Sequence, residues 1–174
     1  HSSVLRLRSQ PNIDPFRLGE NTEMRPVHKT LDQFLTYKMH RLMKQHDKRI
    51  AQSYAEAAQL SLAESRVLAA VGTAGALSNS ELARRANLDK SQASRGADGL
   101  VSRGLVRRSP DEHDGRAVKV TLTPDGERVW RVVIDAARTH YERLFEALTD
   151  EEMLVYETLL DKLLVRSDEL DDQA

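Results

Sequence analysis

A helix predicted between Asp89 and Gly104 combines side chains that can contact nucleic acid on one face with a packing surface on the other. Its polar residues recur at spacings of three and four and form one stripe, which contains Ser91, Ser94, Arg95 and Asp98. Its apolar residues form a second stripe, which contains Ala93, Ala97, Leu100 and Val101. An apolar back that rests on a core, with a short arginine-bearing front, is what a helix needs to read base edges in DNA.

The side chains on this front suit different parts of DNA. Arginine forks onto guanine, glutamine onto adenine, and serine can donate to a phosphate or a base. We therefore predict base and phosphate contacts by Ser91, Gln92, Ser94 and Arg95. A further set of basic residues either contacts phosphates or is only solvated charge, and consists of Lys90, Arg107, Arg108 and Lys119.

Start and stop signals place this helix in a helix-turn-helix. Three pairs can form capping boxes, namely Ser61 with Glu64, Ser78 with Glu81, and Asp89 with Gln92. They predict successive helices over residues 61–75, 79–86 and 89–104. Asn87 can take the left-handed conformation in the brief turn between the last two helices.

Two strand-like segments follow, at residues 105–108 and 117–122, separated by a polar loop at 109–115. This hairpin would be the wing of a winged helix. Thr123 and Pro124 then cap a long helix that extends to about residue 148, and Thr149 with Glu152 opens a last one. Upstream, spacings of three and four predict a long helix over residues 27–58.

The composition bounds the class of protein. The chain has 174 residues, of which 40% are hydrophobic and 30% charged, as is ordinary for a soluble protein. The absence of cysteine excludes disulfides and thiolate metal sites. The sequence contains no apolar run near the length of a membrane span and no signal-peptide pattern, so we expect a cytoplasmic protein without membrane contact.

The net charge of −1 hides an uneven distribution. Residues 78–121 carry nine Lys/Arg against six Asp/Glu, and residues 142–174 carry three against eleven. A nucleic-acid binder needs a basic surface and not a basic whole, although solvated helix faces produce similar asymmetry.

The hairpin residues also carry a family resemblance. The run Asp114-x-Arg116-x-x-x-Val120-x-Leu122-Thr123-x-x-Gly126 resembles the wing signature of the MarR family of bacterial transcription regulators. Three more segments resemble that family, LSLAESRVLAAV (60–71), SELARRANLDKSQASR (80–95) and LVSRGLVRR (100–108). The resemblance covers roughly residues 28–166, and the motifs are specific as a set in this order.

The resemblance implies a mainly α fold with a small β wing, in which a winged helix-turn-helix is joined to a helical dimerisation region. The expected divisions are an N-terminal extension (1–27), the dimerisation region (28–58 and 123–166), the DNA-binding lobe (61–122) and an acidic tail (167–174). The terminal helices carry wide apolar stripes that need partners. The expected dimer contacts are Leu31, Phe34, Leu35, Leu159, Leu160 and Leu163.

The same resemblance implies a homodimer that binds a pseudo-palindromic double-stranded operator, usually as a repressor released by a small phenolic or aromatic acid. Arg116 would enter the minor groove, while Asp114 and Gly126 would be structural in the wing. Ligands in the family bind between the dimerisation helices and the DNA-binding lobe. The polar candidates there, each of which could equally be surface charge or a dimer salt bridge, are Tyr37, His40, Arg41, His46 and Arg66.

Other classes of function fit less well. The sequence has no nucleophile motif, phosphate loop or paired carboxylates in an apolar setting, so we predict neither an enzyme nor a cofactor. His40 and His46 lie six residues apart, about 240° around a helix, which argues against metal sensing. A regulator without a small ligand, controlled by a protein partner through the N-terminal extension, remains the alternative. Gly96 and Gly99 indicate either a close approach to a backbone or to DNA, or a locally loose helix.

Overall fold

The computed structural model describes residues 30–110 and 118–171. Packing divides the chain into two units, residues 1–38 and 39–174. The described part of the first unit consists of the 3-10 turn η1 (Leu31–Gln33) and the start of α1. The fold of the second unit carries the predicted DNA-binding elements.

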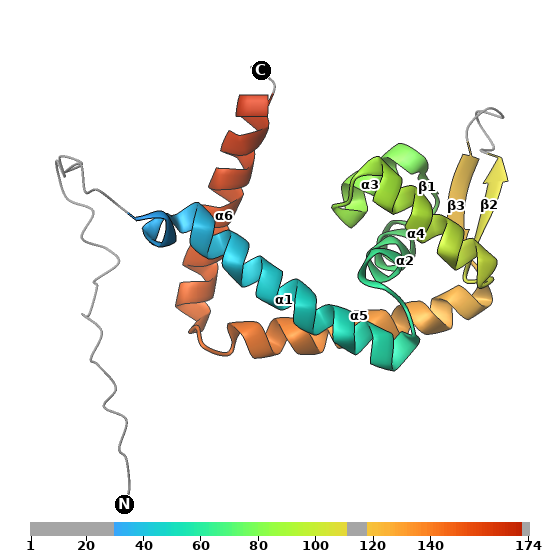
Figure 1. Ribbon diagram of the computed structural model, residues 1–174, viewed down its shortest axis with the longest axis horizontal. Helices are drawn as coiled ribbons and strands as arrows, with labels where there is room; N and C mark the ends of the chain where they lie inside the picture. The colour runs from blue at the N-terminus through green and yellow to red at the C-terminus, as the bar shows by residue number, and fades with distance from the viewer. Residues whose placement is uncertain (1–29, 111–117, 172–174) are drawn as a thin grey trace, which may run out of the picture. The chain divides into compact units, whose positions relative to one another are not determined.

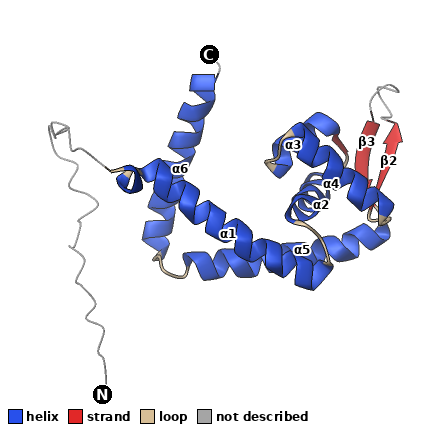
Figure 2. Ribbon diagram, viewed as in Figure 1, coloured by secondary structure: helices blue, strands red, loops and turns tan. Residues whose placement is uncertain are grey.

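The described residues are mainly helical with one small sheet (Figures 1 and 2). In chain order the elements are α1 (Leu35–Ala58), α2 (Leu62–Ala74), β1 (Leu77–Ser78), α3 (Asn79–Ala86), α4 (Lys90–Ser102), β2 (Val106–Pro110), β3 (Val118–Leu122), α5 (Pro124–Phe145) and α6 (Asp150–Asp171). This confirms the predicted fold class. Within the described ranges, none of the helices has the length and apolar character that crossing a membrane requires.

The sheet contains a strand that the sequence did not indicate. It is antiparallel with the order β1-β3-β2, and Leu77 of β1 pairs with Val120 of β3. On the other side of β3, Val120 pairs with Arg108 of β2. β1 has only two residues, too few to show the alternation by which strands are recognised. It ties the start of α3 to the predicted hairpin.

The first long helix begins later than its periodicity indicated. We predicted a helix from residue 27, but α1 begins at Leu35. The Thr30 amide donates to Gln33 Oε1 at 3.2 Å, which closes a separate turn, and Phe34 is extended with φ −70° and ψ 135°. Apolar spacing continues across this interruption, so periodicity alone could not reveal it.

The predicted helix starts after residue 60 are confirmed. Ser61, Ser78 and Asp89 each accept a hydrogen bond from the backbone N–H three residues on. Asn87 takes the left-handed conformation with φ 50° and ψ 54°, and Gly104 has φ 69° after the end of α4. These residues fix the angles at which α3, α4 and β2 follow one another.

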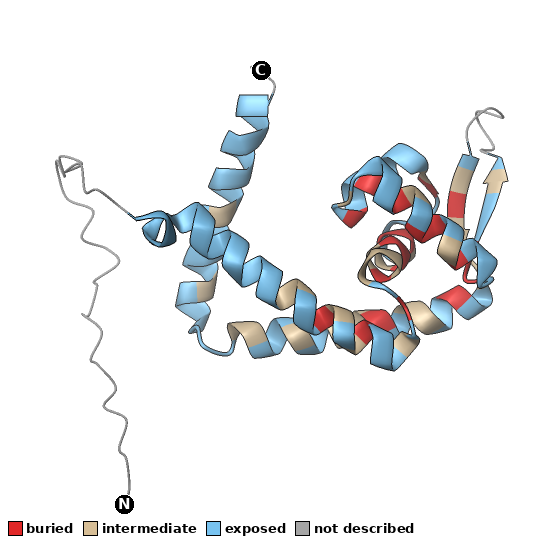
Figure 3. Cartoon of the chain, viewed as in Figure 1, coloured by how far each residue is buried: buried red, intermediate tan, exposed pale blue. Residues whose placement is uncertain are grey.

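The core lies where α2, α3 and α4 meet the sheet and one end of α5 (Figure 3). Its fully buried members include Val67, Leu68, Leu82, Leu100 and Val120. Three of the four residues in the predicted apolar stripe of α4 are buried, namely Ala93, Ala97 and Leu100. The fourth, Val101, is 38% exposed. Burial of this kind contributes roughly 1.5–3 kcal/mol to folding stability per large aliphatic side chain. It therefore holds α4 firmly against α2, α3 and the sheet.

The second half of α1 packs along α5. Ile50 and Tyr54 are buried and belong to the same cluster as Val133 of α5. Ser53 Oγ lies 2.6 Å from His140 Nε2, and the His46 ring meets the His140 ring edge-on at 6.3 Å. Desolvation lowers the pKa of His140, and electrostatic interactions with His46, Arg143 and Arg49 lower it further. The contact between Ser53 and His140 therefore links the two helices.

Candidate nucleic-acid interface

The helix α4 presents the predicted polar front away from the core. Ala93, Ala97 and Leu100 are buried, whereas Ser91 and Arg95 are exposed. Arg95 Nη1 donates to Ser91 Oγ at 2.5 Å, which holds the guanidinium along the helix surface. The arrangement offers an arginine and a hydroxyl together, and both groups can bond base edges or phosphates.

Ser94 and Gln92 are the other two predicted contacts on α4. Ser94 is half-buried. Gln92 Oε1 accepts a hydrogen bond from the backbone N–H of Asp89 at 3.4 Å, and the backbone N–H of Gln92 donates to Asp89 Oδ1 at 2.7 Å. The Gln92 side chain therefore stabilises the start of α4, and its Nε2 group can still donate outward. Lys90, the first residue of the helix, is exposed.

The arginines of β2 are held by neighbouring side chains. Arg107 Nε donates to Thr121 Oγ1 of β3 at 3.2 Å. Arg108 Nη1 lies 2.7 Å from Asp98 Oδ1, which joins the predicted polar stripe of α4 to the first strand of the hairpin. Sequence reasoning placed Arg108 among the phosphate contacts, but it could not show this partner, which is ten residues away. Arg108 would have to share its charge between Asp98 and a phosphate.

Lys119 on β3 is half-buried and also takes part in an interaction within the fold. Two predicted wing residues, Asp114 and Arg116, lie outside the described residues. Their assignments therefore stay predictions from the family resemblance.

Gly126 lies at the base of the hairpin, in the first turn of α5. It is buried, and a Cβ there would stand 1.9 Å from the Leu105 carbonyl oxygen. The same carbonyl accepts the Thr123 amide at 3.1 Å, and Thr123 Oγ1 donates to the Gly104 carbonyl at 2.7 Å. Glycine is required because the backbone before β2 runs against the start of α5.

The predicted ligand candidates do not form one group. Tyr37 is 39% exposed and belongs to the first unit, and His40 and Arg41 are exposed on α1. His46 lies against His140, as described above. Arg66 Nη2 lies 2.7 Å from Asp47 Oδ1 and connects α2 to α1.

A pocket of about 320 Å³ lies beside Arg66, between α2 and α3. It is lined by Arg66, Ala69, Ala70, Thr73, Ala74, Arg85 and Ala86. The sequence analysis did not single out Arg85 as a ligand candidate. The signal that could have found it is its position at the end of α3, next to the small side chains of α2.

The predicted dimer contacts are mostly exposed. Leu31, Phe34 and Leu35 are 70%, 47% and 70% exposed, and Leu159 and Leu163 are 54% and 57% exposed. Leu160 is half-buried. All 22 residues of α6 are described and none is buried (Figure 3). Apolar surface on this scale marks a contact site for another molecule.

Comparison with known proteins identifies the family. Residues 58–117 match the model of the MarR family. The chain is 38% identical over 66 residues to the uncharacterised HTH-type transcriptional regulator YsmB of Bacillus subtilis, in a match that spans 38% of this chain and 45% of YsmB. It is 27% identical over 124 residues to the multiple antibiotic resistance protein MarR of Salmonella typhimurium, a match covering 71% of this chain and 86% of that protein.

Solved structures agree over a longer stretch. A MarR-family regulator from Silicibacter pomeroyi is 31% identical with a TM-score of 0.69, covering 79% of this chain and 92% of that one. Bordetella bronchiseptica BpsR, whose DNA binding is regulated by 6-hydroxynicotinic acid, is 25% identical with a TM-score of 0.70, covering 78% and 96%. Escherichia coli MarR C80S, solved in complex with operator DNA, is 27% identical with a TM-score of 0.66, covering 75% and 93%. The chain therefore belongs to the MarR family and is a DNA-binding transcriptional regulator, not an enzyme.

Proposed function

We propose that this regulator is a homodimeric repressor that binds a pseudo-palindromic operator and is released by a small aromatic acid. The observation that carries the proposal is the exposed Arg95–Ser91 pair on α4, presented beside the hairpin strands. One α4 offers few base contacts, and a two-fold pair doubles them over half-sites about 10 bp apart. The operator complex of the Escherichia coli relative supports this mode of binding.

The apolar surfaces of the terminal helices support the dimer. Leu31 and Leu35 near the start of the described chain, and Leu159 and Leu163 near its end, are each more than half exposed. The exposed side chains of α6 are also strongly acidic, since residues 150–171 contain only two Lys/Arg against eight Asp/Glu. Such a surface suits a partner that carries both apolar and basic groups, as α1 does.

Replacing Arg95 by alanine is expected to weaken operator binding about 10- to 100-fold, because a good arginine–base contact contributes roughly 1–3 kcal/mol of discrimination. The affinity is measured by fluorescence anisotropy on a duplex recovered from genomic DNA by selection with the wild-type protein. Arg138→Ala is the matched control, since Arg138 pairs with Asp135 on the exposed face of α5. An unchanged affinity for Arg95→Ala would refute α4 as the reading helix.

The pocket beside Arg66 is the proposed effector site. Two arginines, Arg66 and Arg85, meet small side chains there, a combination that can hold a carboxylate at one end and an aromatic ring at the other. Arg66 is engaged with Asp47 of α1. An acid that recruits Arg66 would weaken this link between α1 and α2, and so connect ligand binding to the helices proposed to form the dimer.

A thermal-shift screen with 6-hydroxynicotinic acid, benzoic acid and related acids tests this site. We expect at least one acid to raise the unfolding temperature and to lower affinity for the selected duplex. Arg85→Ala should abolish both responses and leave DNA binding without ligand within about threefold of wild type, since Arg85 is on the pocket wall. If every acid fails to stabilise the protein, the alternative gains support, a regulator controlled by a protein partner and not by a small ligand.

A further inference from the structure

The recognition helix α4 approaches α2 so closely that two of its positions have room only for glycine or for a displaced neighbour. A Cβ on Gly96 would lie 3.1 Å from Val67 Cγ2 and 3.3 Å from the Ala63 carbonyl oxygen. Both atoms belong to α2. These distances are tight, and for Gly96 they favour the interpretation of a close approach to a neighbouring backbone within the fold.

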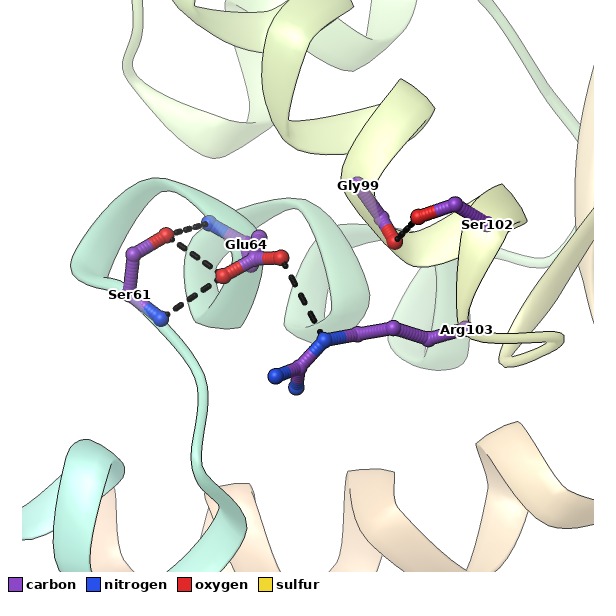
Figure 4. Close-up of polar contacts among 5 residues, drawn as sticks. All are labelled: Ser61, Glu64, Gly99, Ser102 and Arg103. Carbon is purple, nitrogen blue, oxygen red and sulfur yellow. Dashed lines mark hydrogen bonds and ion pairs between the residues drawn. The ribbon is translucent and has the colours of Figure 1, made fainter.

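The second position, Gly99, faces the carboxylate of Glu64 (Figure 4). A Cβ there would lie 2.6 Å from Glu64 Oε1 and 3.3 Å from Glu64 Cδ. Real side chains essentially never approach so closely, so alanine at this position requires either α4 or the Glu64 side chain to move.

The Glu64 side chain is held in place from its other oxygen. Glu64 Oε2 accepts the Ser61 amide at 2.8 Å and the Ser61 hydroxyl at 2.7 Å, which closes the capping box of α2. Oε1 lies 3.9 Å from Nε of Arg103, the residue that follows α4 (Figure 4). The Glu64 side chain is only 17% exposed, so its charge is less screened by water than that of a surface carboxylate.

The contact between Gly99 and Glu64 lies near the C-terminal end of α4, whereas Ser91 and Arg95 lie in its N-terminal half. Ser91 precedes Gly99 by eight residues, which corresponds to about 12 Å along a helix. Because α4 is one continuous helix, a tilt or shift near Gly99 changes where Ser91 and Arg95 meet DNA. Such a displacement alters contacts that depend on base geometry much more than it alters general attraction to phosphates.

We propose that Glu64 is a positioning residue for DNA recognition. One carboxylate oxygen of Glu64 is bound to Ser61 at the N-terminus of α2, and the other pairs with Arg103. Because Gly99 leaves space for this carboxylate, the contact sets the distance between α4 and α2. This inference deepens the proposed function, because it requires that α4 reads the operator. It adds that specificity depends on a carboxylate that never touches DNA.

The substitution Gly99→Ala separates this role from ordinary helix propensity. In an open helix, alanine in place of glycine stabilises the protein. Here we expect a loss of at least tenfold in affinity for the selected duplex, and a change of less than twofold for a shuffled duplex of the same composition. Both are measured by fluorescence anisotropy on the full-length protein.

A double variant tests whether Glu64 is the cause. Glu64→Ala keeps the backbone half of the cap, because the amide of residue 64 still donates to Ser61 Oγ, and is expected to lower the ratio of selected to shuffled affinity about fivefold. Adding Gly99→Ala to Glu64→Ala should cost less than a further twofold, since the clashing oxygen is gone. Fully additive losses would overturn the proposal.

Arg103→Ala provides a test that does not depend on glycine. Arg103 is 40% exposed, so the variant is expected to fold and to lower the selected-to-shuffled ratio several-fold, whereas Arg138→Ala should leave the ratio within twofold. Equal losses on both duplexes would make Arg103 a phosphate contact and refute the positioning role.

The Arg95→Ala variant distinguishes a failure of this inference from a failure of the proposed function. If Arg95→Ala binds the selected duplex as tightly as the wild-type protein, the proposed function itself is refuted.

Discussion

A variant carrying Leu159→Lys and Leu163→Lys is expected to sediment as a monomer, whereas the wild-type chain is expected to sediment as a dimer. The two leucines are separated by one helical turn, lie on one face of α6, and are 54% and 57% exposed in the single chain. If they are buried in the dimer, two lysines there would place unpaired charges in an apolar contact, which costs several kcal/mol.

The variant that cannot dimerise should also bind DNA much more weakly. In the proposed dimer, two linked α4 helices would bind two half-sites at once. A monomer would lose that gain, so affinity for the selected duplex should fall at least 100-fold. The matched control is Leu159→Met with Leu163→Met, which changes the same two positions without adding charge and should leave the dimer intact. Analytical ultracentrifugation decides the matter, and a doubly substituted protein that still sediments as a dimer would show that the interface lies elsewhere.

Local signals in the sequence were sufficient to predict how most elements begin. Ser61, Ser78, Asp89 and Thr123 all act as N-caps. They could be predicted because the backbone N–H that each one binds is only three residues away. The start of α1 was predicted wrongly since two competing local signals overlap there. Periodicity favoured one helix, whereas the Thr30–Gln33 pair closes a separate turn before it.

Contacts between distant residues could not be predicted in the same way. The sequence showed that Arg66 and Arg108 are basic, but not that Asp47 and Asp98 lie 2.7 Å from them. It also left the purpose of Gly99 open, because Glu64 is 35 positions earlier and only the packing of α2 against α4 brings the two together. Candidate contact residues are therefore readable from type and spacing, while the partners that restrain them require the fold.

Replacing Gly126 by alanine is expected to produce the largest loss of stability among single substitutions in the described lobe. The added methyl group would stand 1.9 Å from the Leu105 carbonyl oxygen, which already accepts the Thr123 amide and hydroxyl at 3.1 and 3.2 Å. The obstacle is backbone on both sides, so no side-chain rotation can relieve it. Separating α5 from the strand should lower the free energy of unfolding by about 3 kcal/mol or more.

For a chain of this length, that loss corresponds to a fall in the unfolding temperature of roughly 6–12 °C, which circular dichroism can measure at 222 nm. Glu127→Ala is the matched control, because Glu127 is exposed in the same turn of α5, and it should cost less than about 1 kcal/mol. An alanine variant as stable as wild type would mean that α5 can withdraw from Leu105 freely. The strand pair and α5 would then be independent parts, and the specific wing signature that ends at Gly126 could not be explained by this contact.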